Sequence, residues 1–208
     1  MSIMGMGVTE QDRAIIGRIL SGETDAFRYL VAKYKGLAFH VVRSMIADSS
    51  EHEDLAQDIL ARVFESLPTF RFRCGLATWI SRIGYNTCLN QLRRVKSRPH
   101  ETMKYRAEGY RVDDITPNSG GNSTPVESQT PYSVICRKEL DVAVRDSIKK
   151  LPAHYRLVVT LYYLESFSIA DIALSLGIPK GTIKSDLFRA RAKLKDDLLQ
   201  KFTIEDLL

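Results

Sequence analysis

The chain has 208 residues, of which 44% are hydrophobic and 26% are charged, and these fractions favour a globular protein with substantial cores over a disordered chain. Its formal net charge of +5 favours a polyanionic partner. No apolar run approaches the roughly 20 residues that span a bilayer, and the first residues lack the pattern of a signal peptide. We therefore expect a cytoplasmic protein with no direct membrane insertion.

Residues typical of catalysis or metal binding form no recognisable motif. The three cysteines, Cys74, Cys88 and Cys136, share no C-x-x-C spacing, and the four histidines are scattered. The chain contains no phosphate-binding glycine loop and no G-x-S-x-G. We expect no cofactor, no metal site and no enzymatic activity, and we interpret the cysteines as ordinary core or surface thiols.

The N-terminal part is predicted to be helical almost throughout, up to residue 98. Thr9 is placed to cap a first helix, and apolar residues at spacings of three and four predict a second over about 25–47. A third is predicted to begin near Ser50, with Ser50 as its cap, and to stop at Pro68. A fourth is predicted over about 76–95. Four helices with short connections indicate a compact bundle.

Two neighbouring segments carry charges of opposite sign. Six acidic residues lie between Asp48 and Glu65, whereas seven basic residues and no acidic one lie between Arg71 and Arg98. The acidic helix places Asp54, Gln57 and Asp58 on the face opposite its apolar residues. That face is either a solvated helix surface or a docking surface for a protein partner.

The basic segment is also rich in aromatic residues. Aromatic faces can stack on unpaired bases while Arg and Lys follow the backbone, so the mixture is typical of proteins that bind single-stranded nucleic acid. The same aromatic residues at helical spacing are equally compatible with a bundle core. A set of four polar residues shares one helix face and is harder to explain as core: Asn86, Asn90, Arg93 and Arg94.

Composition changes after Lys96. Residues 97–133 hold four of the seven prolines and little apolar periodicity, which is typical of a flexible linker. Helical periodicity resumes at Val134. We therefore predict an all-α chain of two small helical domains, residues 1–98 and 134–208, joined by a flexible linker over 99–133.

The second domain contains the pattern of a helix-turn-helix. Ser168 can cap a short helix with Asp171 in the reciprocal position, Gly177 can supply a positive φ at its end, and Pro179 suits the start of the next helix. The apolar residues of the second helix recur at spacings of four, three and four and are predicted to face inward. They are Ile183, Leu187, Ala190 and Leu194.

The opposite face of that helix is basic and includes an exposed aromatic residue. Lys and Arg can contact guanine edges or phosphates in the major groove, and Phe188 can contact a thymine methyl group. Alternatively, Phe188 packs on a neighbouring helix and the cations only keep the domain in solution. One acidic residue interrupts the basic ones: Asp186 can pair with Arg189, accept from a cytosine amino group, or lie on the flank without contacts.

Four segments of this chain resemble bacterial RNA polymerase sigma factors of the extracytoplasmic-function (ECF) group, in the family's order and spacing. They are "DAFRYLVAKYKGLAFHVV", "HEDLAQDILARVFESLPTFRF", "ATWISRIGYNTCLNQLRR" and "LPAHYRLVVTLYYLESFSIADIALSLGIPKGTIKSDLFRARAKL". Each is moderately specific, and the resemblance covers the whole chain apart from the linker.

The resemblance implies a transcription initiation factor made of a sigma region 2 domain and a sigma region 4 helix-turn-helix domain. Such a factor binds core RNA polymerase and directs promoter recognition and DNA melting, commonly under the control of a sequestering anti-sigma factor. The implied contacts to the coiled coil of the largest catalytic subunits are Asp54, Gln57 and Asp58. The implied minus-ten contacts are Phe72, Arg73, Trp79, Asn86, Asn90, Arg93 and Arg94. The implied minus-thirty-five contacts are Lys180, Thr182, Lys184, Ser185, Phe188 and Arg189.

The sequence departs from the family pattern in two places. A basic residue is usual where this chain has Asp186, and a small, polar or acidic loop is usual where it has "FRFRCGLATW". Two other classes of function remain open on the residues alone. A stand-alone repressor or activator would use the same helix-turn-helix, usually as a dimer on duplex DNA. An adaptor without DNA contact would leave Phe188 and the Arg93–Arg94 pair unexplained.

Overall fold

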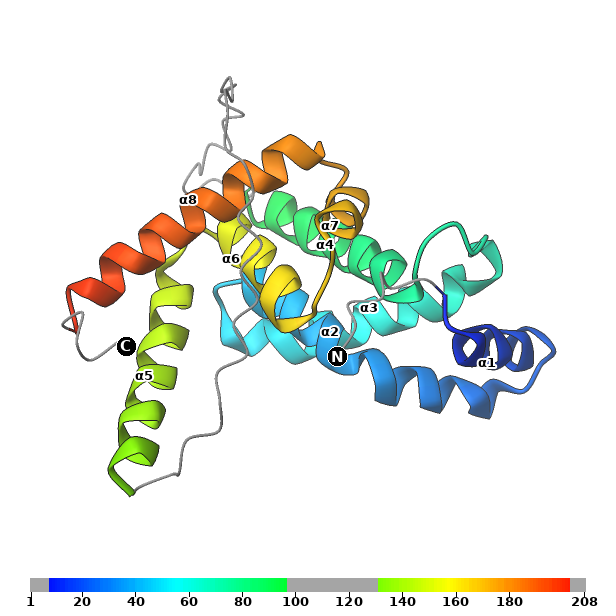
Figure 1. Cartoon of the computed structure of the whole chain (residues 1–208). Coiled ribbons are helices and arrows are strands. Elements are labelled where there is room, and N and C mark those ends of the chain that lie inside the picture. The colour runs from blue at the N-terminus through cyan, green and yellow to red at the C-terminus, as the bar shows by residue number, and fades with distance from the viewer. Residues whose placement is uncertain (1–7, 97–130, 203–208) are drawn as a thin grey trace.

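The computed structural model describes residues 8–96 and 131–202, and every regular element in these ranges is a helix (Figure 1). The all-α prediction is confirmed. The long elements are α1 (Glu10–Leu20), α2 (Phe27–Met45), α3 (His52–Ser66), α4 (Leu76–Lys96), α5 (Pro131–Lys150), α6 (Ala153–Val159), α7 (Ile169–Leu176) and α8 (Lys180–Leu199). Short helical turns connect several of them: Thr24–Ala26, Ser49–Glu51, Leu67–Thr69 and the π-helical turn Thr160–Leu164.

The N-terminal domain, α1 to α4, packs around apolar residues that the helical periodicity identified. From α2, Leu30, Leu37 and Val41 are buried, and Ile59 and Val63 of α3 are fully inaccessible. Gly84 allows α4 to approach closely, because a Cβ built there would lie 3.2 Å from a methyl group of Val41. Close packing of α2, α3 and α4 fixes the direction in which the polar faces of α3 and α4 point.

Helix caps explain where two of these helices begin. Thr9 accepts a hydrogen bond from the Asp12 amide at 3.1 Å, which confirms the predicted cap of α1. The predicted cap of α3 by Ser50 is wrong. Asp48 instead accepts from the amide of Ser50 at 2.9 Å and begins the turn Ser49–Glu51, and α3 continues from that turn without a side-chain cap. The turn Ser49–Glu51 therefore occupies the position where the sequence predicted a side-chain cap.

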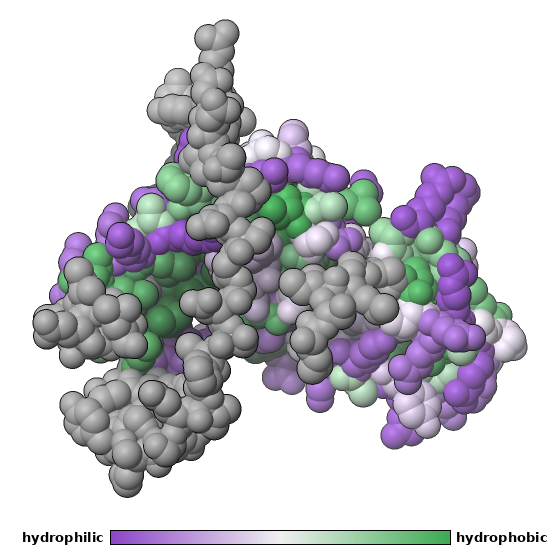
Figure 2. All heavy atoms as spheres, in the orientation of Figure 1, coloured by the Kyte–Doolittle hydropathy of each residue, from purple (hydrophilic) through white to green (hydrophobic). Residues whose placement is uncertain are grey.

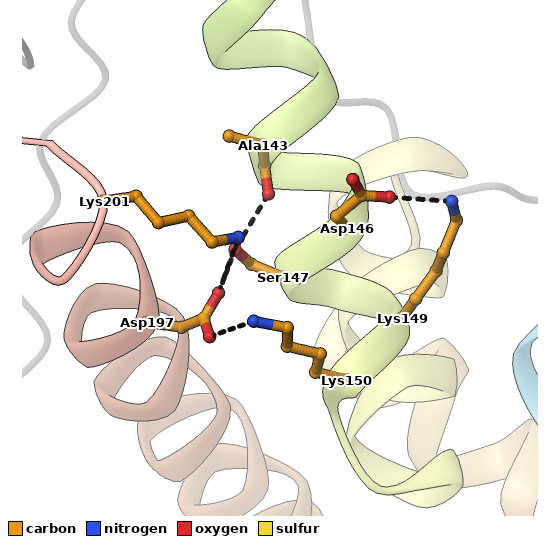
Figure 3. A network of polar contacts seen from close by, with 7 residues as sticks. All are labelled: Ala143, Asp146, Ser147, Lys149, Lys150, Asp197 and Lys201. Carbon is orange, nitrogen blue, oxygen red and sulfur yellow. Dashed lines mark hydrogen bonds and ion pairs between the residues drawn. The ribbon is translucent and has the colours of Figure 1, made fainter.

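The C-terminal domain, α5 to α8, is held partly by a polar network between α5 and α8 (Figure 3). Asp197 of α8 pairs with Lys150 at 2.7 Å and with Lys201 at 3.0 Å, and it accepts from the Ser147 hydroxyl at 2.6 Å. Hydrogen bonds from Lys150, Ser147 and Lys201 hold the pKa of Asp197 well below its ordinary value. The carboxylate therefore stays charged at neutral pH and ties the end of α8 to α5.

A π-helical turn ends α6 and buries an aromatic ring. Thr160–Leu164 follows α6 directly, and the chain then turns through Ser166, which has a φ of 56°. The Phe167 amide donates to the Leu161 carbonyl at 2.9 Å, and the Phe167 side chain is 2% exposed. This turn connects α6 to α7.

The two domains are in direct contact, and α7 lies against α4 in Figure 1. The Thr78 hydroxyl donates to Asp171 at 3.2 Å, and the Ser175 hydroxyl donates to the Thr78 carbonyl at 3.1 Å. Helix α2 also contacts the C-terminal domain: the Ser44 hydroxyl donates to the Thr160 hydroxyl at 3.2 Å, and His40 pairs with Glu165. Buried apolar residues of both domains form one continuous core.

Residues 97–130 lie outside the described ranges, and with them most of the predicted linker. Helix α5 begins at Pro131, slightly before the expected resumption at Val134. No helix within 8–96 or 131–202 combines the length and the apolar character needed to cross a membrane.

Candidate nucleic-acid and polymerase interfaces

Helices α7 and α8 form the predicted helix-turn-helix. The Ser168 hydroxyl accepts from the Asp171 amide at 3.1 Å, which confirms Ser168 as the cap of α7, and it donates to the Asp171 carboxylate at 2.6 Å. Gly177 ends α7 with a φ of 69°, a conformation that glycine adopts without steric cost. Pro179 precedes α8. Each predicted start and stop signal of this motif is therefore confirmed.

Helix α8 has a buried face and a basic exposed face. Ile183, Leu187 and Ala190 are buried against the rest of the domain, as their spacing predicted, and Leu194 is partly buried. Lys180, Thr182 and Lys184 are exposed, whereas Ser185 and Arg189 are half-buried. The Ser185 hydroxyl donates within its own helix to the Gly181 carbonyl at 3.1 Å.

Phe188 stands out among the exposed residues of α8. Its side chain is 57% exposed, so it does not pack on a neighbouring helix as the alternative interpretation required. An aromatic ring exposed among cations on one face of a helix is suited to an apolar contact at the edge of a base.

Asp186 does not lie on the exposed face of α8. It is 6% exposed, and its carboxylate forms a 2.7 Å hydrogen bond with Nε2 of His154, the second residue of α6. The interpretations of Asp186 as a reader of cytosine and as a flank residue without contacts are therefore wrong. On a helical wheel Asp186 lies next to the exposed face of α8. In the structure, this side of α8 contacts α6 and is therefore buried.

Arg191 has a role that the sequence did not indicate. Its Nε donates to the Tyr163 hydroxyl at 2.6 Å, and its guanidinium lies 5.6 Å from the centre of the Tyr163 ring. This contact joins α8 to the π-helical turn after α6. Tyr163 lies 28 residues before Arg191, so no local pattern in the sequence indicates the contact.

Helix α4 presents the predicted polar face. All four of its members are exposed: Asn86, Asn90, Arg93 and Arg94. Arg93 donates to the Asn90 side chain at 3.5 Å, so the two side chains lie side by side. An exposed row of amides and guanidinium groups can bond to phosphates and to unpaired base edges.

The aromatic residues before α4 form a cluster that is both core and surface. The Phe70 ring is buried and contacts the Phe72 ring at 4.9 Å and the Trp79 ring at 5.0 Å between centroids. Phe72 and Trp79 are only partly buried, and Arg73 beside them is exposed. Phe70 therefore belongs to the core, whereas the Phe72 and Trp79 rings keep a solvent-facing side, so their predicted contact with unpaired bases stays a prediction.

The acidic face of α3 is exposed as a unit. Asp54, Gln57 and Asp58 are all exposed, whereas Leu55 and Ile59 on the opposite side are buried. At the α1 end of the molecule, hydrophilic side chains likewise dominate the outer surface in Figure 2, with apolar ones between them. The face of α3 is open to a partner without rearrangement of the domain.

Cys74 and Cys88 are free thiols. Burial raises the pKa of Cys88 to about 12, and burial is also the main cause that raises the pKa of Cys74. Both thiols are therefore protonated at neutral pH and poor nucleophiles. Among the residues that the structure describes, no three side chains of the metal-binding types gather into a site.

Two family models match this chain. Residues 30–98 match the model described as "Sigma-70 region 2", and residues 141–194 match the model described as "Sigma-70, region 4". The first match contains α3, α4 and most of α2. The second contains the helix-turn-helix.

Curated relatives match over nearly the full length. The chain is 30% identical over 195 residues to the RNA polymerase sigma-H factor of Pseudomonas aeruginosa, with 92% of this chain and 95% of the relative covered. It is 28% identical over 183 residues to the ECF RNA polymerase sigma factor SigW of Bacillus subtilis, covering 88% of this chain and 94% of that one.

Solved structures share the fold. CnrH, in a complex with the cytosolic domain of CnrY, matches with a TM-score of 0.59 at 23% identity, covering 92% of this chain and 99% of that chain. The sigma factor RpoE of Bartonella quintana, in a complex with the anti-sigma factor NepR, matches with a TM-score of 0.57 at 22% identity, covering 83% and 96%. The two matched models, the full-length relatives and the helix-turn-helix geometry together place this chain in the sigma-70 family, as an RNA polymerase sigma factor of the ECF group.

Proposed function

We propose that this sigma factor uses three separate surfaces, one for core RNA polymerase and one for each of two promoter elements. The proposed domains are residues 1–98 for polymerase binding and the minus-ten element, 99–133 as linker, and 134–208 for the minus-thirty-five element. The observation that supports this most directly is the exposure, in one chain, of an acidic face on α3 and basic faces on α4 and α8.

The acidic face of α3 is proposed to dock on the core polymerase. Asp54 and Asp58 lie one helical turn apart with Gln57 between them, and all three are exposed. Opposite charge on the polymerase coiled coil would steer docking and fix its register. The charge on this face is opposite to that of both proposed DNA surfaces, so DNA does not compete for it.

The face of α4 and the loop before it are proposed to capture the minus-ten strand. The exposed amides and guanidinium groups are suited to backbone and base contacts, and the partly exposed rings of Phe72 and Trp79 are suited to stacking. The proposed contacts are Phe72, Arg73, Trp79, Asn86, Asn90, Arg93 and Arg94.

The exposed face of α8 is proposed to read the minus-thirty-five element in the major groove. Lys184 and Phe188 lie one turn apart and project from the middle of the exposed face, which suits base-edge contacts. Lys180 and Thr182 lie at the start of the helix, where phosphate contacts are common. The proposed set is Lys180, Thr182, Lys184, Ser185, Phe188 and Arg189.

Regulation by an anti-sigma factor is also proposed. The two solved structures described above were obtained in complexes, one with the cytosolic domain of CnrY and one with the anti-sigma factor NepR. Action as a polymerase subunit supports a cytoplasmic location. It also supports a role in initiation without catalytic activity of its own.

A reconstitution experiment tests the proposal. The purified chain is mixed with bacterial core RNA polymerase, and co-elution in gel filtration and promoter-dependent run-off transcription are measured. We expect both, and we expect Asp58→Ala to reduce co-elution while Lys184→Ala leaves it unchanged. Tight operator binding by the chain alone, with no gain from polymerase, would instead support a stand-alone regulator.

A further inference from the structure

Helix α1 contacts the loop that precedes α4, although α1 lies outside the residues 30–98 that match sigma region 2. The guanidinium carbon of Arg13 lies 4.7 Å from the centre of the Phe72 ring. The Phe72 ring also contacts the Phe70 ring, and the two ring centroids are 4.9 Å apart. Phe72 is thus held between a cation from α1 and the aromatic cluster that leads into α4.

Arg13 is placed by a firmly docked helix. Its neighbour Asp12 is 3% exposed and accepts hydrogen bonds from Lys33 at 2.7 Å and from the Tyr34 hydroxyl at 3.1 Å. Ile16 and Ile19 of the same helix are buried in the core. These contacts fix the rotation of α1, and with it the position from which Arg13 reaches Phe72.

Phe72 has a backbone conformation that needs support. Its φ is 57°, in the left-handed region that a bulky residue rarely adopts. Such a conformation persists only where surrounding contacts impose it. The attraction between the Arg13 guanidinium and the ring face is one of the contacts that support this conformation.

We infer that Arg13 is a positioning residue for minus-ten capture, acting through Phe72. By holding the Phe72 ring, Arg13 maintains the conformation of residues 70–75 and so sets how Arg73 and the ring meet the separated strand. This inference rests on the proposed role of the Phe72 loop. It adds a helix outside the matched region to the machinery of promoter opening.

The test compares Arg13→Ala with Arg18→Ala, using full-length protein and core polymerase. Arg18 lies on the same helix, is exposed, and pairs with Glu23, so it is a matched control for loss of one surface cation. Promoter opening is followed by permanganate reactivity of unpaired thymines, and closed-complex affinity and thermal unfolding are measured separately. We expect Arg13→Ala to lower the opening rate about two- to fivefold, the factor that ~0.5–1 kcal/mol represents. Closed-complex affinity and thermal unfolding are expected to match those of Arg18→Ala.

A double-mutant cycle with Phe72→Leu shows whether Arg13 acts through the ring. In the Phe72→Leu background, Arg13→Ala is expected to have no further effect on opening. Additive effects, or equal losses for Arg13→Ala and Arg18→Ala, would overturn the inference. Failure of the wild-type protein to open any promoter with polymerase would instead count against the proposed function, so the two failures are distinguishable.

Discussion

Asp186 is a buried residue of α8 that lies beside the exposed residues proposed to contact the minus-thirty-five element. Its carboxylate is bonded to His154 and nearly inaccessible, whereas Lys184 and Phe188 beside it are exposed. Removing one partner of a buried hydrogen bond costs about 1–3 kcal/mol. Substitutions on the two sides of this helix should therefore have different consequences.

We expect Asp186→Ala to lower the free energy of unfolding by about 1–3 kcal/mol, because it leaves His154 without its partner. For a chain of this size each kcal/mol corresponds to a fall of about 2–4 °C in Tm. Urea unfolding and a scan of Tm measure the loss. The minus-thirty-five preference, scored with a randomised promoter library under conditions where the variant is folded, should not change. A changed preference with unaltered stability would contradict this assignment.

Phe188→Ala is expected to weaken use of the minus-thirty-five element without lowering the stability of the fold. The side chain is 57% exposed, so its truncation should leave Tm within about 1–2 °C of the wild type. Loss of an apolar contact with a base should weaken use of the minus-thirty-five element by about 1–3 kcal/mol, or roughly five- to 150-fold. Abortive transcription from promoters with and without that element measures the effect, and equal losses on both templates would argue against groove recognition.

At the scale of elements, the docking of α1 depends on a titrating group. Burial alone would raise the pKa of Asp12, but the hydrogen bonds from Lys33 and Thr9 outweigh it and hold the pKa below the ordinary 3.8. The folded state therefore favours the ionised carboxylate. This contribution to stability is complete well above pH 4 and is lost as the pH falls below 3.8 through the folded-state pKa.

Asp12→Asn should consequently reduce the free energy of unfolding by about 1–3 kcal/mol at pH 7, and the difference from wild type should shrink as the pH falls below 3.8. Urea unfolding at pH 7, 4 and 3 provides the measurement. Asp25→Asn is the control for loss of one exposed carboxylate. A difference that stays constant over this pH range would show that Asp12 contributes by packing alone.

Most local signals, with the exception of the cap at Ser50, could be predicted from the sequence, whereas long-range contacts could not. The caps at Thr9 and Ser168 and the stop at Gly177 depend on residues three or four positions apart, and all are present. By contrast, His154 lies 32 residues from Asp186, and Arg13 reaches a ring far along the chain. No periodicity in α8 or α1 indicates these partners, because they depend on which helices become neighbours.

At the scale of the whole molecule, the contact between the two domains limits what the chain can touch at once. Thr78 contacts Ser175, and Asn86 lies eight residues beyond Thr78, about 12 Å along α4. Residues 175–188 could span at most about 47 Å if they were fully extended, so the distance between Asn86 and Phe188 cannot exceed about 65 Å. Minus-ten and minus-thirty-five elements about 25 base pairs apart are separated by about 85 Å of duplex. We therefore expect the domains to separate before both elements are bound.

A reversible cross-link tests this opening. The hydroxyl oxygens of Ser44 and Thr160 are 3.2 Å apart across the interface, which suits replacement of both by cysteine and formation of a disulfide. The oxidised Ser44→Cys, Thr160→Cys variant, freed of oxidant before polymerase is added, should lose transcription from two-element promoters and regain it with reductant. The single-cysteine variants are the controls. Full activity of the oxidised variant would contradict the requirement for opening.

The central claim, that one chain recognises two promoter elements as a polymerase subunit, is tested most directly by mapping the transcripts that reconstituted polymerase initiates on a randomised promoter library. With the wild-type chain we expect start sites that share two upstream motifs at a fixed spacing. With Lys184→Ala we expect the distal motif to weaken while the proximal one remains. Start sites without a shared upstream motif, or no gain over core polymerase alone, would contradict the account.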